Sequence, residues 1–469
     1  MRRYPRNSGR KNEQGLIITL VAIFMLGVVG AMAALAIDVV TLYTARSEAQ
    51  LASDGAALAG ARVLANSGMT SDPNAATDGL RDNAITLASA VATQVAASNQ
   101  VGGRTLSPTA GSPCSAGEIC VNINTRLTNF LANPRVTVTV QRTDLPTFFA
   151  RIWGTRQLAV KATATAEAYN PSTLPGTGAN EPPVKPLCVK PWLLPNLDPS
   201  VTATDGKVFE SNGTISPTGL LGWETQNQNI YPFPAPAVGT YLKTACPGGD
   251  CSGVLPAPTA PAMTWHYYPG DPGDFTSPAA SSVTCSPTAA GFTGTPYERS
   301  IAGCVQAPIS CNQSVNIDTS NYPNRDSESA RAVNCLTHAT GDHADSVDKT
   351  TYSSPYYPFE FLAGDEDPLV AAGVITGGQD VPVSDSVVTV PVFNSPTSGN
   401  ITNPVTVIGF VQLFLNPEGH HVHLGGGQQY WIHTMVINMV GCGTSASGTL
   451  NPVYGNGPSA VPVRLITPP

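Results

Sequence analysis

Residues 16–37 read LIITLVAIFMLGVVGAMAALAI, a run of 22 residues without a charged side chain. At about 1.5 Å of rise per residue, a helix of this length spans roughly 33 Å, enough to cross the hydrocarbon core of a bilayer. Basic residues dominate the preceding tail, residues 1–15, and basic flanks stay on the cytoplasmic side. The sequence therefore predicts a single-pass anchor with its N-terminus inside and its bulk outside, held by apolar residues that include Leu16, Ile17, Leu20, Phe24, Leu26, Leu35 and Ile37.

A cleaved signal peptide is the competing interpretation of this segment. Ala31-Met32-Ala33 and Ala34-Leu35-Ala36 both have the small-residue spacing of a cleavage site. The apolar run is longer than the core of a signal peptide, however, and the helical pattern continues through Asp38 without a breaker. We therefore expect an uncleaved anchor.

A seam of small residues follows the apolar run. Residues 38–66 contain no Pro, and apolar positions recur at alternating spacings of three and four, which predicts one helix packed against another element. Small side chains let two backbones approach closely while burying little area. The partner is either a second subunit, through self-association, or later segments of this chain. The seam consists of Leu42, Ala45, Ala49, Ala52, Ala56, Ala59 and Val63.

The same region carries a family resemblance. Residues 36–46 read AIDVVTLYTAR and residues 48–61 read EAQLASDGAALAGA. With Gly15 before the apolar run, these strings resemble the N-terminal module of TadE/TadG-like proteins over residues 13–62, with Ser53 and Gly55 as departures. The positions that carry the resemblance are Gly15, Asp38, Tyr43, Arg46, Gln50, Leu51, Asp54, Ala56, Ala57, Leu58 and Ala59.

The resemblance implies a component of Flp/Tad pilus assembly, or of a related export apparatus, in the bacterial inner membrane. Its implied partners are the lipid bilayer and pilus-assembly or envelope proteins. Ordinary type IV pilins carry a Glu five residues after the Gly of the cleavage site, whereas Leu20 stands at that position after Gly15. An accessory role is therefore expected rather than that of a major fibre subunit.

Residues 38–169 have the outline of a pilin-like α+β region. Apolar spacing predicts a second helix over 75–98, and alternation predicts strands over 119–125, 135–143 and 157–169. A short helix is expected over 146–153. Together these elements predict a long helix against a small antiparallel sheet.

The segment 170–186 is rich in Pro and Gly and is expected to be a linker. Residues 187–469 contain short apolar runs separated by turn residues, with the clearest strands over 386–393, 404–415 and 430–440, and no convincing helix of ten or more residues. We expect a mainly-β, sandwich-like extracytoplasmic domain. A Cys188–Cys442 bridge is a further hypothesis for tying its ends together.

Charge and cysteine distribution constrain the partners and the compartment. Residues 1–186 carry 16 Lys/Arg and 11 Asp/Glu, whereas residues 187–469 carry 8 and 21, which argues against nucleic acid as a partner. All ten cysteines follow the apolar run, as expected of disulfides in an oxidising compartment. They are Cys114, Cys120, Cys188, Cys246, Cys251, Cys285, Cys304, Cys311, Cys335 and Cys442.

Enzymatic chemistry finds little support in the sequence. Asp318-Thr319-Ser320 lacks the last Ser of a von Willebrand factor A metal loop, and nucleotide-binding and hydrolase motifs are missing. Acidic runs around Asp342 and Asp365 lack the pattern of a Ca²⁺ loop. We expect no enzyme and no cofactor; the weak candidate metal ligands are His420, His421, His423 and His433, of which His421 and His423 would share one face of a strand.

Two rival functions remain open at this stage. A surface adhesin or carbohydrate-binding protein would use a loop-rich acidic β domain with aromatic segments such as 264–268 and 352–359. An exported metal-dependent hydrolase would use the His cluster.

Overall fold

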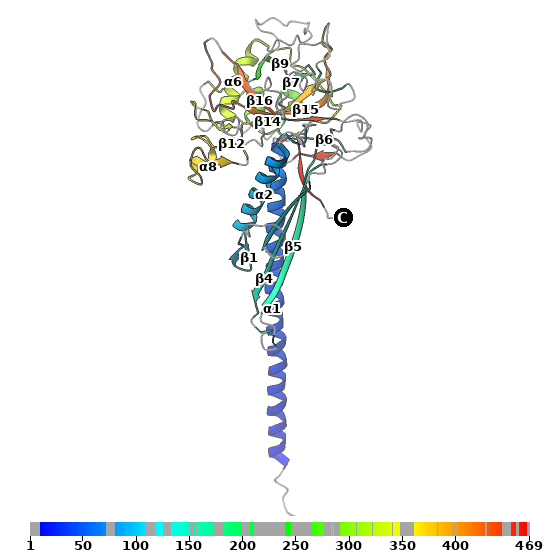
Figure 1. The fold of residues 1–469 in the computed structure, drawn as a ribbon, viewed down its shortest axis with the longest axis vertical. Coiled ribbons are helices and arrows are strands. Elements are labelled where there is room, and N and C mark those ends of the chain that lie inside the picture. Colours follow the sequence, from blue (N-terminus) through cyan, green and yellow to red (C-terminus); the bar gives the residue numbers. More distant parts are fainter. Residues whose placement is uncertain are drawn as a thin grey trace, which may run out of the picture.

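One long helix and a β-rich head make up the molecule (Figure 1). Helix α1 covers Arg10–Asn66, 57 residues that extend about 85 Å at helical rise. The prediction that helix continues through Asp38 is thereby confirmed. The computed structural model describes residues 10–71, 80–107, 118–124, 133–147, 149–150, 154, 157–172, 182–197, 207–210, 240–244, 255, 264–275, 283, 285, 291–305, 307–320, 322–339, 341–347, 361–381, 383–396, 399–426, 429–442, 452–455 and 459–466.

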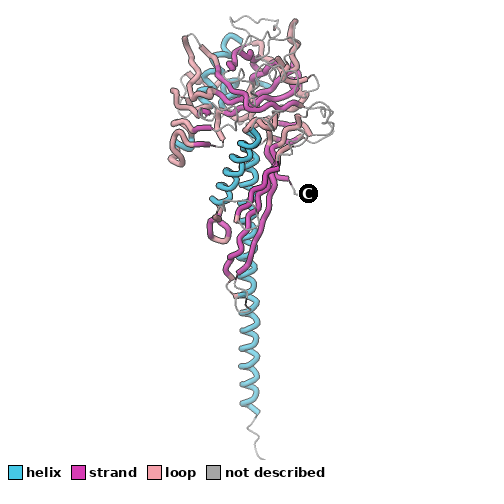
Figure 2. The backbone as a smooth tube through the Cα atoms, viewed as in Figure 1, coloured by secondary structure: helices cyan, strands magenta, loops and turns pink. Residues whose placement is uncertain are grey.

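Only the upper part of α1 has protein around it (Figure 2). There α1 lies against helix α2 and a four-stranded antiparallel sheet of order β18-β5-β4-β3. We call residues 38–66 of α1, α2 and this sheet the stalk. The bounds are α2 Leu80–Ser98, β3 Ile119–Asn124, β4 Arg135–Pro146, β5 Gln157–Ala168 and β18 Val463–Ile466.

Alternation of side chains fixes the face that the stalk sheet turns toward the helix. Val136, Val138 and Val140 of β4 are fully buried, as a period of two requires. On the opposite face, threonine hydroxyls of β4 and β5 form hydrogen-bonded cross-strand pairs, each 3.0 Å long. The strands expected from the sequence are thus present, and β4 is longer than expected.

The chain returns to the stalk after building the head. β18, from the C-terminal end of the chain, pairs antiparallel with β5. Within the segment 170–186, β6 (Val184–Lys185) pairs in parallel with β17 (Val453–Tyr454), and Asn170 is buried. The described ends of this segment are therefore packed against the protein, and its centre, residues 173–181, lies outside the described residues.

The main sheet of the head closes on itself. Its order is β10-β15-β14-β7-β9-β8-β16, and β15 also pairs with β16. This ring differs from the two separate sheets of a sandwich. The strand bounds are β7 Trp192–Pro195, β8 Thr240–Thr244, β9 Thr264–Pro269, β10 Ser314–Val315, β14 Val387–Phe393, β15 Val405–Leu415 and β16 Ile432–Gly441.

Two hydrophobic clusters hold the head. One cluster contains residues from all six strands of the closed ring, β7, β8, β9, β14, β15 and β16; Trp192, Trp265 and Val390 are examples. It also contains Tyr297 of helix α5 (Pro296–Ala302) and Val333 of helix α6 (Tyr322–Leu336). The other cluster takes the opposite face of β14 to β16 and continues without interruption into the stalk. The stalk and the head therefore share one core.

Short elements complete the described fold. A three-stranded sheet of order β11-β12-β13 lies beside the head, and a two-stranded β1–β2 pair follows α2 (Figure 1). Their bounds, with those of two one-turn helices, are β1 Gln100–Val101, β2 Arg104–Thr105, β11 Ser346–Val347, β12 Phe361–Leu362, β13 Asp380–Val381, α4 Pro272–Phe275 and α8 Pro368–Ala371.

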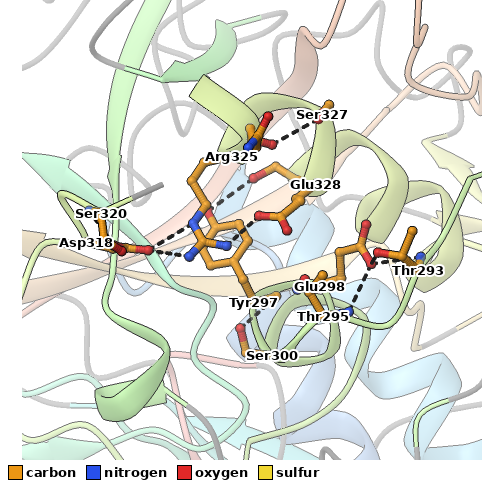
Figure 3. A network of polar contacts seen from close by, with 12 residues as sticks. Thr293, Thr295, Tyr297, Glu298, Ser300, Asp318, Ser320, Arg325, Ser327 and Glu328 are labelled. Carbon is orange, nitrogen blue, oxygen red and sulfur yellow. Dashed lines mark hydrogen bonds and ion pairs between the residues drawn. The ribbon is translucent and has the colours of Figure 1, made fainter. Parts of the chain in front are cut away.

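Helix α6 corrects the expectation that no helix of ten or more residues follows residue 186. It has 15 residues, most of them polar, and its described buried apolar side chains lie in its second half, among them Ala332 and Val333. Buried ion pairs stabilise it: Arg325 pairs with Asp318 and, one turn along the helix, with Glu328 (Figure 3). The guanidinium also lies 4.3 Å from the ring centroid of Tyr297.

A third buried carboxylate, that of Glu298, fixes helix α5 to α6. Thr295 and Glu298 form a capping box at the start of α5 (Figure 3). Glu298 also pairs with Arg331 of α6 at 2.7 Å. Burial raises the pKa of the Glu298 carboxyl, but hydrogen bonds, the strongest from Arg331, outweigh burial and lower that pKa below its ordinary value.

Three disulfides join described residues, and the Cys188–Cys442 hypothesis is wrong. The bridges are Cys188–Cys304, Cys285–Cys335 and Cys311–Cys442. The last one forms because the backbone just before β10 and the residue just after β16 both bond to β15, which brings their sulfurs together. Cys120 is also disulfide-bonded, whereas Cys114, Cys246 and Cys251 lie outside the described residues.

The ion-pair network predicts a large effect of Arg325→Ala. Removing the guanidinium leaves two buried carboxylates uncompensated, so we expect the free energy of unfolding to fall by about 3–5 kcal/mol. Urea unfolding at pH 7, followed by tryptophan fluorescence, measures this. The exposed Arg46→Ala variant is the control and should differ from the wild type by under about 0.5 kcal/mol.

Acid should reduce the difference between the wild type and Arg325→Ala. Burial raises the pKa of Asp318, but hydrogen bonds from Ser320 and Arg325 outweigh it and leave the pKa below its ordinary value. A carboxyl with a lowered folded-state pKa stabilises the fold above its unfolded-state pKa, and this contribution is lost as pH falls through the folded value. A difference that stays constant down to the acid transition would contradict this account.

Candidate functional site: the stalk and its junction with the head

The lower part of α1 exposes its apolar side chains. The most apolar 18-residue window has a mean hydropathy of 2.7, and none of it is buried. Within the described residues this is the one helix long and apolar enough to cross a membrane, which fits a single-pass anchor. The exposed fractions are Leu16 71%, Ile17 62%, Leu20 65%, Phe24 68%, Leu26 76%, Leu35 55% and Ile37 49%.

Asp38 is a buried acid at the upper end of the apolar run. Its Oδ2 accepts hydrogen bonds from the backbone N–H groups of Phe149, at 3.1 Å, and Ala150, at 2.8 Å. Only 5% of Asp38 is exposed. The carboxylate therefore fixes the connection between β4 and β5 to the point where α1 leaves the apolar run. The sequence predicts a short helix over 146–153; Pro146 belongs to strand β4 instead, and half of this range lies outside the described residues.

The alanine seam packs against later segments of the same chain. Ala45, Ala49, Ala52 and Ala56 are fully buried, in contact with α2 and the stalk sheet. Val63 is 9% exposed, while Leu42 and Ala59 are partly buried. Alanines of α2, among them Ala88 and Ala92, face the seam, so the two helices meet through small side chains on both sides.

Two glycines in this segment have different surroundings. A Cβ at Gly60 would lie 3.0 Å from Val136 Cγ1, 3.2 Å from the carbonyl oxygen of Ala88 and 3.2 Å from Ala92 Cβ. Gly60 thus permits the close approach of α1 to α2 and β4. A Cβ at Gly55 would meet only Val95 Cγ1, at 4.0 Å.

The resembling motif divides between the two faces of α1. Ala56 and Ala57 point into the core, and Leu58 is partly buried. Tyr43 and Leu51 are 70% and 69% exposed, and Arg46 is also exposed. The Gln50 amide donates to Asp54 Oδ1 at 2.7 Å along the surface, and Gly15 lies in the lower part of α1. With Val40, which is 63% exposed, Tyr43 and Leu51 form an unburied apolar stripe.

A buried hydrogen-bond network joins the stalk to the head. Asn438 of β16 donates from Nδ2 to the carbonyl oxygen of Ala65, in the last turn of α1, and to Gln412 Oε1 of β15. Ser71 donates to the Met439 carbonyl oxygen at 2.9 Å and accepts from the Met439 N–H at 3.0 Å. The end of α1 is therefore bonded directly to the central strands of the head.

Asn170, two residues after strand β5 of the stalk sheet, belongs to the same hydrogen-bond network. Its Nδ2 donates to the carbonyl oxygens of Thr70, at 3.1 Å, and Met439, at 3.0 Å. The sequence analysis did not identify these residues. Asn438 and Gln412 each interrupt an apolar strand, and a polar side chain at such a position requires a buried partner, which was the available signal.

The four histidines only partly converge. His421 and His423 lie in a loop rather than on a strand, with ring centroids 4.8 Å apart. His420 and His421 both contact Asp342 Oδ1, at 3.2 and 3.0 Å. His433 lies on β16 against Tyr241. Within the described parts of the chain, no group of three or more His, Cys, Asp or Glu side chains is arranged to hold a metal.

The comparisons with known proteins point to the lower half of the molecule. Residues 16–63 match a family model described as Flp pilus-assembly TadE/G-like. Residues 16–63 are a TadE/G-like segment. The match begins with the apolar run and ends at the close contact of α1 with the stalk sheet, so it includes the anchor, Asp38 and the seam. No curated protein and no solved structure matches the chain.

The two glycines of the TadE/G-like segment predict opposite effects. Gly55→Ala should raise the free energy of unfolding by about 0.5–1 kcal/mol, because Ala favours helix and fits the space. Gly60→Val should lower it by about 1–3 kcal/mol, because the added methyl groups force α1 away from β4. Thermal unfolding of the detergent-solubilised chain, followed by circular dichroism, tests both. Shifts in the same direction would refute the packing described here.

Asp38→Ala should loosen the β4–β5 connection. It removes the acceptor of two backbone N–H groups, so exchange of the Phe149 and Ala150 amides should accelerate about tenfold, equivalent to ~1.4 kcal/mol. Hydrogen exchange with mass spectrometry measures this. Asp54→Ala, which removes only a surface contact with Gln50, is the control. Equal protection of the Phe149 and Ala150 amides in the two variants would be evidence that Asp38 does not hold the β4–β5 connection.

Proposed function

We propose that this chain is a membrane-anchored, non-enzymatic, TadG-like component of Flp/Tad pilus assembly or a related export apparatus. The observation that carries the proposal is the match of residues 16–63 to the TadE/G-like model, coincident with the anchor, Asp38 and the seam. In this role the chain lies in the bacterial inner membrane with its N-terminus inside. The basic tail before the anchor supports that orientation.

The stalk is suited to hold the head at a fixed distance from the membrane. α1 passes from the apolar run into the stalk as one helix, and a continuous hydrophobic cluster extends from the seam into the head. The Asn438 network adds direct hydrogen bonds at the junction. Since both ends of the stalk are fixed, a force or displacement at the membrane is transmitted to the head rather than absorbed by a flexible linker.

The exposed stripe of Val40, Tyr43 and Leu51 is the proposed contact with partner proteins. It lies on the face of α1 that the seam leaves uncovered, immediately above the anchor. Because the seam is buried by this chain's own α2 and sheet, association with another subunit has to use this second face. The proposed partners are envelope or pilus-assembly proteins with a membrane-proximal helix.

The described residues that the sequence suggests for the rival functions do not form the expected sites. Trp265, Tyr267 and Tyr268 in the aromatic segment 264–268 are buried in the core, so these three rings do not supply an adhesive surface, and 352–359 lies outside the described residues. The imidazoles of His420 and His421 both contact Asp342, but no group of three or more His, Cys, Asp or Glu side chains among the described residues is arranged to hold a metal ion.

Genetic complementation in the native host tests the function. Deleting the gene should abolish surface pili, and the wild-type gene should restore them. A Tyr43→Ala/Leu51→Ala double variant should restore far fewer pili, because the partner contact is lost while the buried seam stays intact. Tyr454→Ala, which removes an exposed aromatic ring from the head, is the matched control.

Membrane fractionation accompanies this experiment and separates the two parts of the proposal. The full chain should resist salt and carbonate extraction in the deletion strain carrying each variant. Normal piliation without the gene would refute the assembly role, and release of the chain by salt alone would refute the anchor.

A further inference from the structure

A patch of partly exposed side chains lies on the outer face of the head ring, across three strands. Strand register places His433 of β16 opposite Tyr241 of β8, and Tyr241 opposite Thr264 of β9. The neighbouring row contains Lys243 of β8 opposite His266 of β9. Trp431, which precedes Ile432 of β16 and thus continues the same register, completes that row. We call these six side chains the aromatic patch.

Alternation along the strands separates the patch from the core. Leu242, Trp265 and Ile432 lie between the patch residues along their strands and are buried inside the ring. Every patch residue is partly exposed on the other side. Strands lie about 4.8 Å apart, and alternate residues about 6.8 Å apart, so the patch covers an area comparable to a disaccharide.

The side chains of the patch are held in position by one another. The ring centroids of Tyr241 and Trp431 are 5.0 Å apart, and those of Tyr241 and His433 are 4.3 Å apart in an edge-to-face contact. Lys243 Nζ lies 5.4 Å from the centroid of Trp431. A surface pre-ordered in this way loses little side-chain entropy on binding.

The chemistry of the patch matches a pyranose ring. One face of a pyranose carries C–H bonds that pack against aromatic rings, and its edge carries hydroxyls that need both donors and acceptors. Trp431 and Tyr241 offer the rings, and His433, His266, Lys243 and Thr264 offer the polar groups. We propose that the aromatic patch is a saccharide-binding site of the head.

Neutral histidines strengthen this match. Burial, followed by the charge of Lys243, lowers the pKa of His266, and burial lowers the pKa of His433. Both imidazoles are therefore neutral at pH 7, and each offers one N–H donor and one nitrogen acceptor. Saccharide hydroxyls use both kinds of group, whereas an apolar protein partner would leave them unpaired.

Titration of the full-length protein with defined oligosaccharides tests the site. The protein is solubilised in lauryldimethylamine oxide, because glycosidic detergents would compete for the patch. Isothermal calorimetry with three oligosaccharides distinguishes the sources of the saccharide. Chitohexaose represents a cell-wall-like chain, cellohexaose a neutral extracellular-type chain, and hexagalacturonate an acidic chain. We expect saturable binding of at least one of the three.

Substitutions locate the binding. Trp431→Ala and Tyr241→Ala should each weaken binding at least about tenfold, whereas Trp431→Phe, which keeps an aromatic ring, should weaken it by less. Tyr454→Ala, outside the patch, should leave binding unchanged. Circular dichroism verifies that the variants fold. If an alanine variant does not fold, Trp431→Phe still tests the site.

The proposal fails if none of the three oligosaccharides binds at millimolar concentrations, or if binding survives both alanine substitutions. The assembly role of the TadE/G-like segment is independent of either result, since piliation is scored separately. Loss of saccharide binding in Trp431→Ala with normal piliation would support the patch and leave the assembly role intact.

Discussion

Close packing of α1 against its own chain is the constraint on which the rest of the structure depends. A helix with large side chains could not lie simultaneously on α2 and on the stalk sheet, because the backbones would be held too far apart. Alanines such as Ala49 and Ala52, together with Gly60, allow both contacts. Each alanine buries little area, so stability comes from the length of the seam and from the sheet that covers it.

That packing turns a membrane helix into a rigid support. No part of the most apolar 18-residue window of α1 is buried, which suits a helix surrounded by lipid. At the upper end of the apolar run Asp38 fixes the sheet to the helix, and at the end of α1 Asn438 fixes the helix to the head. Between these two points the core is continuous. In the proposed role, position along α1 determines distance from the bilayer.

The head solves a different problem, that of stabilising a domain poor in helix and rich in Pro and Gly. Closing the sheet through the pairing of β15 with β16 leaves fewer unpaired edges. Disulfides reinforce it, and the one between Cys311 and Cys442 joins two segments that share β15 as a neighbour. Buried charges in α6 add specificity at some cost in desolvation. The aromatic patch lies on the outer face of β8, β9 and the start of β16.

The sequence by itself determined the features that depend on local order: the anchor, the single long helix, the alternating strands of the stalk and the β-rich character of the head. Each follows from periodicity or length, which neighbouring residues encode. Only the tertiary structure decided which segment covers the alanine seam, how the disulfides pair and where Asn438 finds its partners. It also revealed α6, whose polar residues are stabilised by Asp318, a partner outside the helix. Such contacts join residues distant in sequence, so no local pattern records them.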